Sequence, residues 1–361
     1  MKVLVTDPIA EAGLARLREA GHDVVTAYDV EGDDLLAAVS DAAALVVRSG
    51  TEVTREVLEA GPNLIIVGRA GIGVDNIDLE AATEHGVIVA NAPEGNARAA
   101  AEHTVAMAFA AARSIPQAHA RLKAGDWAKG EYLGTELNGK TLGVVGLGRV
   151  GQEVGRRMNG LGMDLVAFDP YISEERADQV GAELCALDEC LARADFLTIH
   201  TPRTTETEGM IGEAELAQLE GGYLINCARG GIVDEAALAA AVEDGVLAGA
   251  AVDVFAQEPI AADNPLLDVD EVVVTPHLGA STAAAQEKVA TTTADQVIAA
   301  FEDQPVINAL NAPSVDETAF PRLRPYIEIA ETAGTVATHL LDGRVEEIEV
   351  RYEGDIAEEN V

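Results

Sequence analysis

Residues 144–151 read VVGLGRVG and place Gly146, Gly148 and Gly151 at the spacing G-x-G-x-x-G, directly after an apolar run. In this pattern the first glycine permits a tight turn from strand to helix, and the second lets the main chain approach a pyrophosphate. The third lets the following helix pack close to its strand, so that the helix N-terminus faces the anion. The segment therefore predicts a phosphate-binding turn.

The flanking residues predict the elements that this turn requires. Residues 141–145 have the pattern of a buried strand, residues 150–161 that of a helix and residues 164–168 that of the next strand. Asp169 follows this second strand, where an acidic side chain can accept hydrogen bonds from the ribose hydroxyls. Its negative charge would repel a 2′-phosphate, so we expect NAD rather than NADP.

The chain has 361 residues, of which 48% are hydrophobic, which is enough for two main domains with separate cores. No run approaches the length of a membrane span, and the N-terminal MKVLVTD has the pattern of a first strand, so we expect a cytoplasmic protein. The three cysteines, Cys185, Cys190 and Cys227, have neither a disulfide framework nor a metal-ligand spacing. Buried reduced thiols and no metal site are therefore expected.

The formal net charge is −38, because 62 acidic residues stand against 24 basic ones. Such a balance disfavours nucleic-acid binding. The acidic residues are spread along the chain, which indicates a solvated surface. Halophilic proteins use this kind of excess where salt screens the self-repulsion. We therefore interpret the chain as halophilic, with an ordinary acidic protein as the alternative.

Residues 2–91 alternate short apolar strands with helical stretches, which predicts a parallel sheet covered by helices but without a glycine fingerprint of its own. This is the candidate substrate domain. Ligands of such sheets bind outside the carboxyl ends of the strands, where Arg48 and the segment Arg69–Asn76 stand. Either arginine could hold an anion.

Residues 93–112 predict a buried, alanine-rich helix that connects the domains, and residues 113–127 are expected to extend it toward a partner subunit, which makes a homodimer or homotetramer. Four later strands each end in a polar residue, and these residues should meet at one sheet edge as an active site: Thr201, Arg229, Asp253 and His277. A long helix over residues 281–304 can return to the first domain.

The predicted architecture is therefore α/β, with two doubly wound parallel-sheet domains, a Rossmann NAD domain inserted into a flavodoxin-like substrate domain. The expected boundaries are 1–96 with 289–315 for the substrate domain, 97–288 for the NAD domain and 316–361 for a C-terminal tail.

Six segments in order and spacing resemble the D-2-hydroxyacid dehydrogenases over nearly the whole chain: VGRAGIGVDNIDLEAA, AAAEHTVAM, GTELNGKTLGVVGLGRVG, NCARGGIVDE, AVDVFAQEP and PHLGAST. The resemblance implies that Arg229, Glu258 and His277 are catalytic. It also implies NAD contacts at Ile72, Arg149, Val150, Asp169, Thr201, Pro202, Cys227, Ala228, Asp253, Leu278, Gly279 and Ala280. In the family a polar threonine often stands at the position of Ile72. Because isoleucine has no polar side chain, the expected NAD contact there is a backbone contact.

Oxidation of a 2-hydroxy acid by hydride transfer requires the same residue types. Oxidation of a secondary alcohol requires removal of the hydroxyl proton, which an imidazole such as that of His277 can accept and return. A carboxylate at Glu258 can orient the ring and favour its protonated form. Arg229 has the planar fork that grips an α-carboxylate. Asp253 is expected either at the nicotinamide end of the cofactor or in a capping role.

The resemblance is strongest to members that oxidise 3-phosphoglycerate to 3-phosphohydroxypyruvate, the first step of L-serine biosynthesis. The expected substrate-binding residues are Arg48, Arg69, Asn96 and Lys129. Two alternatives stay open: a hydroxypyruvate or glyoxylate reductase of the same family, and a dinucleotide-sensing, corepressor-like binding module. Residues 316–361 predict one helix and a strand at 345–352, which resembles the start of an intervening domain, so a shortened C-terminus and insensitivity to serine are expected.

Overall fold

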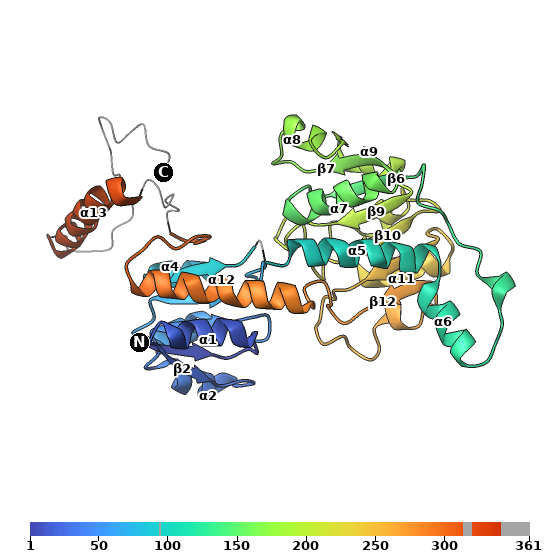
Figure 1. Ribbon diagram of the computed structural model, residues 1–361. Helices are drawn as coiled ribbons and strands as arrows, with labels where there is room; N and C mark the ends of the chain where they lie inside the picture. The colour runs from blue at the N-terminus through green and yellow to red at the C-terminus, as the bar shows by residue number, and fades with distance from the viewer. Residues whose placement is uncertain (94, 313–319, 341–361) are drawn as a thin grey trace. The chain divides into compact units, whose positions relative to one another are not determined.

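The computed structural model describes residues 1–93, 95–312 and 320–340. The chain divides into two compact units, one of Met1–Pro93 with Glu287–Val361 and one of Glu94–Gln286. Each unit has its own parallel sheet with helices packed on it (Figure 1). The predicted α/β class with two parallel sheets is confirmed.

The first unit contains a sheet in the order β2-β1-β3-β4-β5, in which every pairing is parallel. Short runs rich in Val, Ile and Leu form these strands, and their side chains are buried on both faces because helices cover each face. The strands are β1 (Lys2–Val5), β2 (Asp23–Thr26), β3 (Ala44–Val47), β4 (Ile66–Arg69) and β5 (Ile88–Asn91). The helices are α1 (Glu11–Glu19), α2 (Gly32–Val39), α3 (Arg55–Ala60), α4 (Leu79–Glu84) and α12 (Ala283–Phe301).

The second unit contains a parallel sheet in the order β12-β11-β10-β9-β6-β7-β8. The strand order reverses beside β6, and ligands of doubly wound sheets bind at such a switch point. The strands are β6 (Thr141–Val145), β7 (Asp164–Phe168), β8 (Ala182–Leu184), β9 (Phe196–Ile199), β10 (Tyr223–Asn226), β11 (Gly249–Val252) and β12 (Val272–Val274). The helices are α5 (Ala97–Ala112), α6 (Ile115–Lys123), α7 (Arg149–Gly160), α8 (Glu174–Asp178), α9 (Leu187–Arg193), α10 (Glu213–Leu216) and α11 (Glu235–Glu243), with 3-10 turns at Lys129–Glu131 and Pro265–Leu267.

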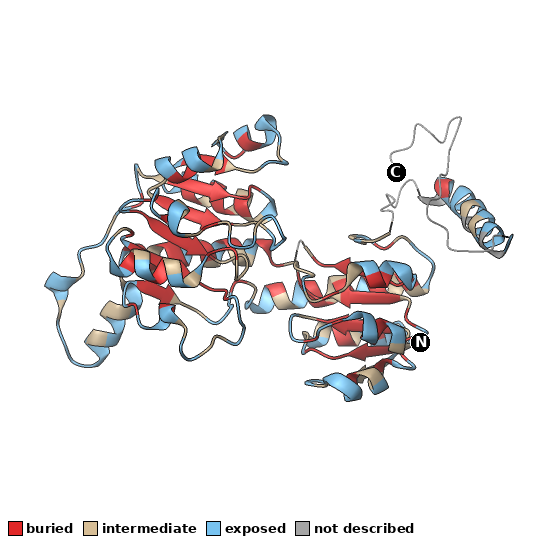
Figure 2. Cartoon of the chain, turned by 180° about the vertical axis from the view of Figure 1, so that it is seen from behind, coloured by how far each residue is buried: buried red, intermediate tan, exposed pale blue. Residues whose placement is uncertain are grey.

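Burial follows the strands in both units. Figure 2 shows buried residues along the sheets and exposed ones on the outer faces of the helices. In the second unit one apolar cluster includes Leu142, Val154 and Phe196, and another, which includes Ile199, Leu224 and Leu238, is distinct from it. Two clusters hold a rigid sheet between them, so the loops at its edge start from fixed strand ends.

The expected continuation of the connecting helix through residues 113–127 is wrong. Helix α5 ends at Ala112, and Ser114 has a left-handed backbone with φ of 46° before α6 begins. Pro116 in the first turn of α6 fits this restart because its missing N–H would have no helical partner there. The chain returns to the end of α5 where Thr135 N–H donates to the Ala112 carbonyl at 2.8 Å.

The described part of the tail is α13 (Phe320–Leu340). The strand expected at 345–352 lies outside the described residues. Among the residues that the structure describes, no helix is both long and apolar enough to span a membrane.

Candidate active site

The glycine turn joins β6 to α7 and has the geometry that the sequence predicts. Gly146 has a φ of +90°, and a Cβ there would lie 2.8 Å from the main-chain carbon of His200. A Cβ on Gly151 would lie 2.2 Å from the Gly146 carbonyl oxygen, which explains the close packing of α7 on the turn. Gly148 differs, because a Cβ there would meet no described atom within 4 Å. The space over Gly148 is thus left for a ligand at the α7 N-terminus.

Asp169 follows β7 and is tied to the glycine turn. Its Oδ2 accepts the Leu147 N–H at 2.8 Å, and its Oδ1 accepts the Tyr171 N–H at 2.9 Å. Each carboxylate oxygen has a further lone pair with which it can accept from a ribose hydroxyl. After β9, the buried Thr201 Oγ1 has no hydrogen-bond partner among the described residues. A buried hydroxyl of this kind is a position where a ligand would complete the bonding.

His277 and Glu258 form the pair that the sequence analysis predicts. His277 Nδ1 lies 2.7 Å from Glu258 Oε2, while Glu258 Oε1 accepts the Phe255 N–H at 3.0 Å. Burial acts to raise the pKa of Glu258, but the hydrogen bonds from His277 and Phe255 outweigh it and hold that pKa below its usual value. An ionised carboxylate fixes the proton on Nδ1, which leaves Nε2 as the ring nitrogen that can exchange a proton with a substrate.

The loop that carries His277 is anchored by Asp253, whose side chain is 0% exposed. Asp253 Oδ1 accepts the Leu278 N–H at 2.7 Å, and Oδ2 accepts the Gly279 N–H at 2.8 Å. The Asp253 carbonyl also accepts the His277 N–H at 2.9 Å. His277 itself has a φ of 54°, a left-handed conformation that a non-glycine residue keeps only when its surroundings hold it. Both oxygens of Asp253 therefore support the capping role directly, and its nicotinamide contact stays a prediction.

Arg229 lies in the turn after β10. Its Nη1 donates to the Ala228 carbonyl at 2.6 Å, and Asn226 fixes the same turn by donating to the Arg229 carbonyl at 3.0 Å. A Cβ on Gly230 would lie 1.8 Å from the Phe255 carbonyl oxygen, so this turn and the segment after β11 touch main chain to main chain. The residues on either side of that contact are Arg229 and the loop that leads to Glu258.

With one exception, the remaining predicted cofactor residues lie just after the carboxyl ends of strands in the second sheet. Pro202 follows β9, Cys227 and Ala228 follow β10, and the segment Leu278–Ala280 follows β12. Burial and the neighbouring Asp253 carboxylate raise the pKa of the Cys227 thiol, which keeps it protonated. Arg149 and Val150 begin α7. Ile72 is the exception because it belongs to the first unit, where its carbonyl accepts from Asn91 Nδ2 at 2.5 Å.

The four predicted substrate residues are divided between the units. Arg48 and Arg69 lie at the ends of β3 and β4 in the first unit. Asn96 precedes α5 in the second unit, and its 8% exposed side chain has an Oδ1 without a partner among the described residues. Lys129 lies beyond the other end of α5, a helix of 16 residues or about 24 Å. The structure therefore does not place Lys129 beside Asn96 within one chain.

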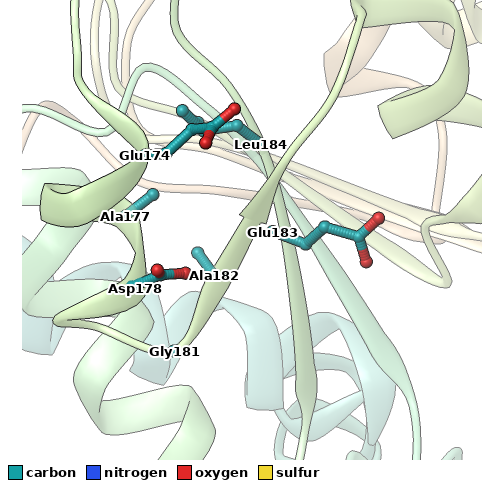
Figure 3. Close-up of a pocket in the computed structure, with 7 residues that line it drawn as sticks. All are labelled: Glu174, Ala177, Asp178, Gly181, Ala182, Glu183 and Leu184. Carbon is teal, nitrogen blue, oxygen red and sulfur yellow. The ribbon is translucent and has the colours of Figure 1, made fainter.

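A hollow of about 420 Å³ lies elsewhere in the second unit, between α8 and β8 (Figure 3). The acidic residues that line it are Glu174, Asp178 and Glu183. Strand β8 is at one edge of the sheet, whereas the loops with Asp253 and His277 follow β11 and β12 at the other. Because none of the residues lining it is basic, the hollow does not suit a phosphate-bearing ligand.

Three residues of the site were not identified from the sequence: His103, Asn226 and Thr275. Asn226 ends a run of strand residues and caps its turn, a role for which asparagine at a strand end is a recognisable signal. Thr275 Oγ1 donates to Asp253 Oδ1 at 2.5 Å. His103 approaches the same oxygen from α5, and nothing in the local sequence indicates that contact.

Comparison with known proteins identifies the family. Residues 105–279 match the model for the D-isomer specific 2-hydroxyacid dehydrogenase NAD binding domain. The chain is 45% identical to the D-3-phosphoglycerate dehydrogenase of Archaeoglobus fulgidus, over 100% of this chain and 68% of that relative. The chain belongs to the D-isomer specific 2-hydroxyacid dehydrogenase family. Identity is also 45% to the D-3-phosphoglycerate dehydrogenase of Methanocaldococcus jannaschii, over 99% of this chain and 68% of the relative.

A solved structure agrees with this D-2-hydroxyacid dehydrogenase fold. The TT0316 protein of Thermus thermophilus is 32% identical and superposes with a TM-score of 0.80, covering 86% of this chain and 100% of its own. The chain thus spans about two thirds of the sequence relatives but the full length of this structural neighbour.

As a D-2-hydroxyacid dehydrogenase, the chain is an enzyme that uses NAD. The second unit fits that cofactor on three observations: the open space over Gly148, the carboxylate of Asp169 after β7, and the Thr201 hydroxyl, which bonds to none of the described residues. NAD bound there would supply the acceptor for a hydride from a 2-hydroxy acid.

Proposed function

We propose that this chain catalyses the NAD-dependent oxidation of 3-phosphoglycerate to 3-phosphohydroxypyruvate, the first step of L-serine biosynthesis. Two relatives that carry the name D-3-phosphoglycerate dehydrogenase are each 45% identical to it over its whole or nearly whole length. The observation that carries the chemistry is the 2.7 Å contact between His277 Nδ1 and Glu258 Oε2. We also propose a cytoplasmic location, where a phosphorylated intermediate would be available.

In the proposed reaction the C2–H bond breaks as a hydride leaves, and the O–H bond breaks as a proton leaves. His277 Nε2 accepts that proton while Glu258 stabilises the imidazolium from the other side of the ring. The guanidinium of Arg229 pairs with the α-carboxylate, which fixes C2 and polarises the carbonyl that forms. In the reverse direction His277 returns the proton to the carbonyl oxygen.

We propose that Arg48 and Arg69 provide the charge for the phosphate. Both stand at carboxyl ends of parallel strands, where doubly wound sheets bind ligands, and both are half-buried. The main-chain N–H of Arg48 donates to Asp7 Oδ2 at 2.5 Å, which fixes the loop after β3. A Cβ on Gly71 would collide with the Arg69 guanidinium, so a glycine is needed for that side chain to lie over its loop.

NADH formation separates the candidate functions. We expect steady NADH production with 3-phosphoglycerate, and a kcat/KM at least about 100-fold lower with D-glycerate, which lacks the phosphate. His277→Gln should lose about 10²- to 10⁴-fold in kcat and keep its affinity for NADH. A preference for unphosphorylated acids would instead assign the chain as a hydroxypyruvate or glyoxylate reductase. Cofactor binding without turnover of any 2-hydroxy acid would assign it as a sensor.

We propose that the enzyme is a homodimer or a homotetramer. The segment between Ala112 and Thr135 exposes several large apolar side chains, and soluble monomers rarely expose such side chains close together. The exposed side chains include Ile115, Leu122, Trp127 and Leu133, and Trp127 is 77% exposed. Light scattering in molar salt should give a mass of at least two chains. Trp127→Glu with Leu133→Glu should shift that mass toward one chain, and a monomeric wild type would refute the interface.

A further inference from the structure

His103 on α5 reaches the buried carboxylate that holds the His277 loop. Its Nε2 lies 3.1 Å from Asp253 Oδ1 and 3.3 Å from Thr275 Oγ1, and its side chain is 19% exposed. A carboxylate only accepts hydrogen bonds, so Nε2 carries the proton in this contact. Helix α5 packs against β10, β11 and β12, which gives the imidazole a fixed origin.

A fully buried carboxylate is unfavourable unless its charge is satisfied. Asp253 has four donors at its two oxygens: the Thr275 hydroxyl, the Leu278 and Gly279 amides, and His103. Burial acts to raise the pKa of Asp253, and among the contributions that oppose it the hydrogen bond to His103 is the largest, so that the pKa lies below its usual value. His103 is the one of these four donors that can also carry a positive charge.

The same place also contains Cys227, whose thiol lies within 4.8 Å of both the imidazole nitrogen and the carboxylate. Histidine, cysteine and aspartate together are a metal-ligand set. In this structure, however, the Asp253 oxygens already accept four donors, and the Cys227 pKa is raised by burial and by Asp253. A hydrogen-bonded His103–Asp253 pair describes the geometry better than a metal centre does.

We propose that His103 is a positioning residue for the reaction, which keeps Asp253 ionised and thereby holds the Leu278 and Gly279 amides and the loop that presents His277 to Glu258. This inference rests on the proposed function of His277 as the group that exchanges the substrate proton.

The loop depends on Asp253 remaining an acceptor. A protonated Asp253 would turn one oxygen into a donor, which would then face an N–H or O–H donor. His277 has a φ of 54°, a left-handed conformation that is strained outside glycine and that its surroundings must hold. With one anchor lost, the loop would relax toward ordinary backbone angles, and a misplacement of about 1 Å in a reacting group can cost about 100-fold in rate.

The test compares His103→Leu with His103→Gln, whose amide nitrogen can donate where Nε2 does. We expect kcat with 3-phosphoglycerate to fall at least about tenfold in the leucine variant and to recover to within about threefold of wild type in the glutamine variant. The affinity for NADH should fall less than kcat in the leucine variant, because the glycine turn at the α7 N-terminus does not depend on this loop. His85→Leu is the matched control, because His85 is an exposed residue of the first unit whose ring Nδ1 bonds to the Ala81 carbonyl one helical turn earlier.

If His103→Leu does not fold, His103→Asn gives the same comparison, since its side chain is polar but too short to reach Asp253. Wild-type kcat in the leucine or asparagine variant would overturn the proposal. So would an equal loss in the glutamine variant, because that result would mean that the donor is not what matters.

A second readout does not depend on the substrate. The ring resonances of His277, among only 7 histidines in the chain, can be assigned by NMR with His277→Gln as a reference. They should shift in His103→Leu and return toward wild type in His103→Gln. Unmoved His277 resonances would refute the positioning role. If instead wild type fails to oxidise 3-phosphoglycerate while the resonances shift, the proposed substrate is wrong and the positioning role stands.

Discussion

At the scale of single residues, the site is built from side chains that hold main chain as much as from side chains that face a substrate. Asp169 ties the end of β7 to the glycine turn, Asp253 holds the amides after His277, and Asn226 fixes the Arg229 turn. Each contact is a hydrogen bond between a side chain and the backbone of a loop. The reacting groups are thus positioned by a framework of polar contacts that a search for reactive side chains alone would pass over.

Glu258→Gln should change the pH dependence of oxidation more than it changes binding. The wild-type carboxylate has a lowered pKa, so it is ionised through the neutral range and favours the protonated ring of His277. A neutral amide can still accept from the ring but no longer stabilises that charge. The acid limb of kcat/KM should therefore move to lower pH, with a maximal kcat lower by about 10- to 100-fold.

The stability associated with Glu258 has a definite sign. Because its folded-state pKa is lowered, its contribution is present above the unfolded pKa and is lost as pH falls through the folded value. Glu258→Gln should lose stability relative to wild type at neutral pH and approach it in acid. For the kinetic prediction, a pH–rate profile of Glu258→Gln that matches wild type would remove Glu258 from the mechanism.

Asp169→Asn should narrow the preference for NAD over NADP. The amide oxygen can still accept the Leu147 N–H, but the negative charge that would repel a 2′-phosphate is gone. We expect the ratio of kcat/KM values for the two cofactors to fall at least about tenfold. Asp169→Ala should narrow it too, and should also lose about 1 kcal/mol of stability with the hydrogen bond to the glycine turn. An NADP preference in wild type would contradict the assignment.

At the scale of elements, the sequence predicts most of the candidate site residues, because the ends of strands can be recognised from the sequence pattern. A run such as FLTI or YLIN followed by polar residues predicts both the strand and the loop that carries function, and β9 to β12 all follow that pattern. Contacts between elements cannot be recognised from the local sequence in this way. The approach of His103 to Asp253 joins residues 150 apart and depends on how α5 packs, and the break at Ser114 depends on a left-handed residue that local propensity does not indicate.

The glycines of the turn between β6 and α7 should respond differently to alanine. Gly146→Ala meets both a positive φ and the main chain of His200, and we expect it to destabilise the protein by about 2 kcal/mol or more. Gly148 has an ordinary φ of −68° and open space around it, so Gly148→Ala should leave the melting temperature within about 2 °C of wild type.

The same pair separates folding from cofactor binding. Gly148→Ala should weaken NADH binding at least about tenfold, since a methyl group would enter the space through which the turn approaches the pyrophosphate. Titration of NADH fluorescence against each variant measures this. Unimpaired NADH binding by Gly148→Ala would show that the cofactor phosphates bind elsewhere.

At the scale of the whole molecule, the chain folds as two separately packed units and has 62 acidic residues against 24 basic ones. The fold class follows from the alternation of strands and helices, and both strand orders are those of doubly wound sheets. The net charge of −38 is only locally relieved by ion pairs that lie mostly on the surface, such as Arg193 with Glu183 and Glu189. Exposed pairs of this kind contribute little stability, so they do not offset the long-range repulsion.

Salt should stabilise this protein through screening. The Debye length falls from about 30 Å at 0.01 M to about 3 Å at 1 M, so molar salt removes most of the repulsion between distant carboxylates. We expect the melting temperature to rise by at least about 10 °C between about 0.05 M and about 2 M KCl. An equal concentration of a neutral osmolyte should raise it less, and a melting temperature that falls with KCl would refute the halophilic interpretation.

The contact at Gly230 limits how this enzyme can change over generations of selection. With 1.8 Å from a Cβ to the Phe255 carbonyl oxygen, and 2.5 Å to the Ala256 nitrogen, no side chain fits, and the obstacle is main chain that no rotamer change can clear. A saturation library at position 230 should return glycine alone among folded variants. The spacing between the arginine turn and the loop of the carboxylate is therefore inherited as a fixed length.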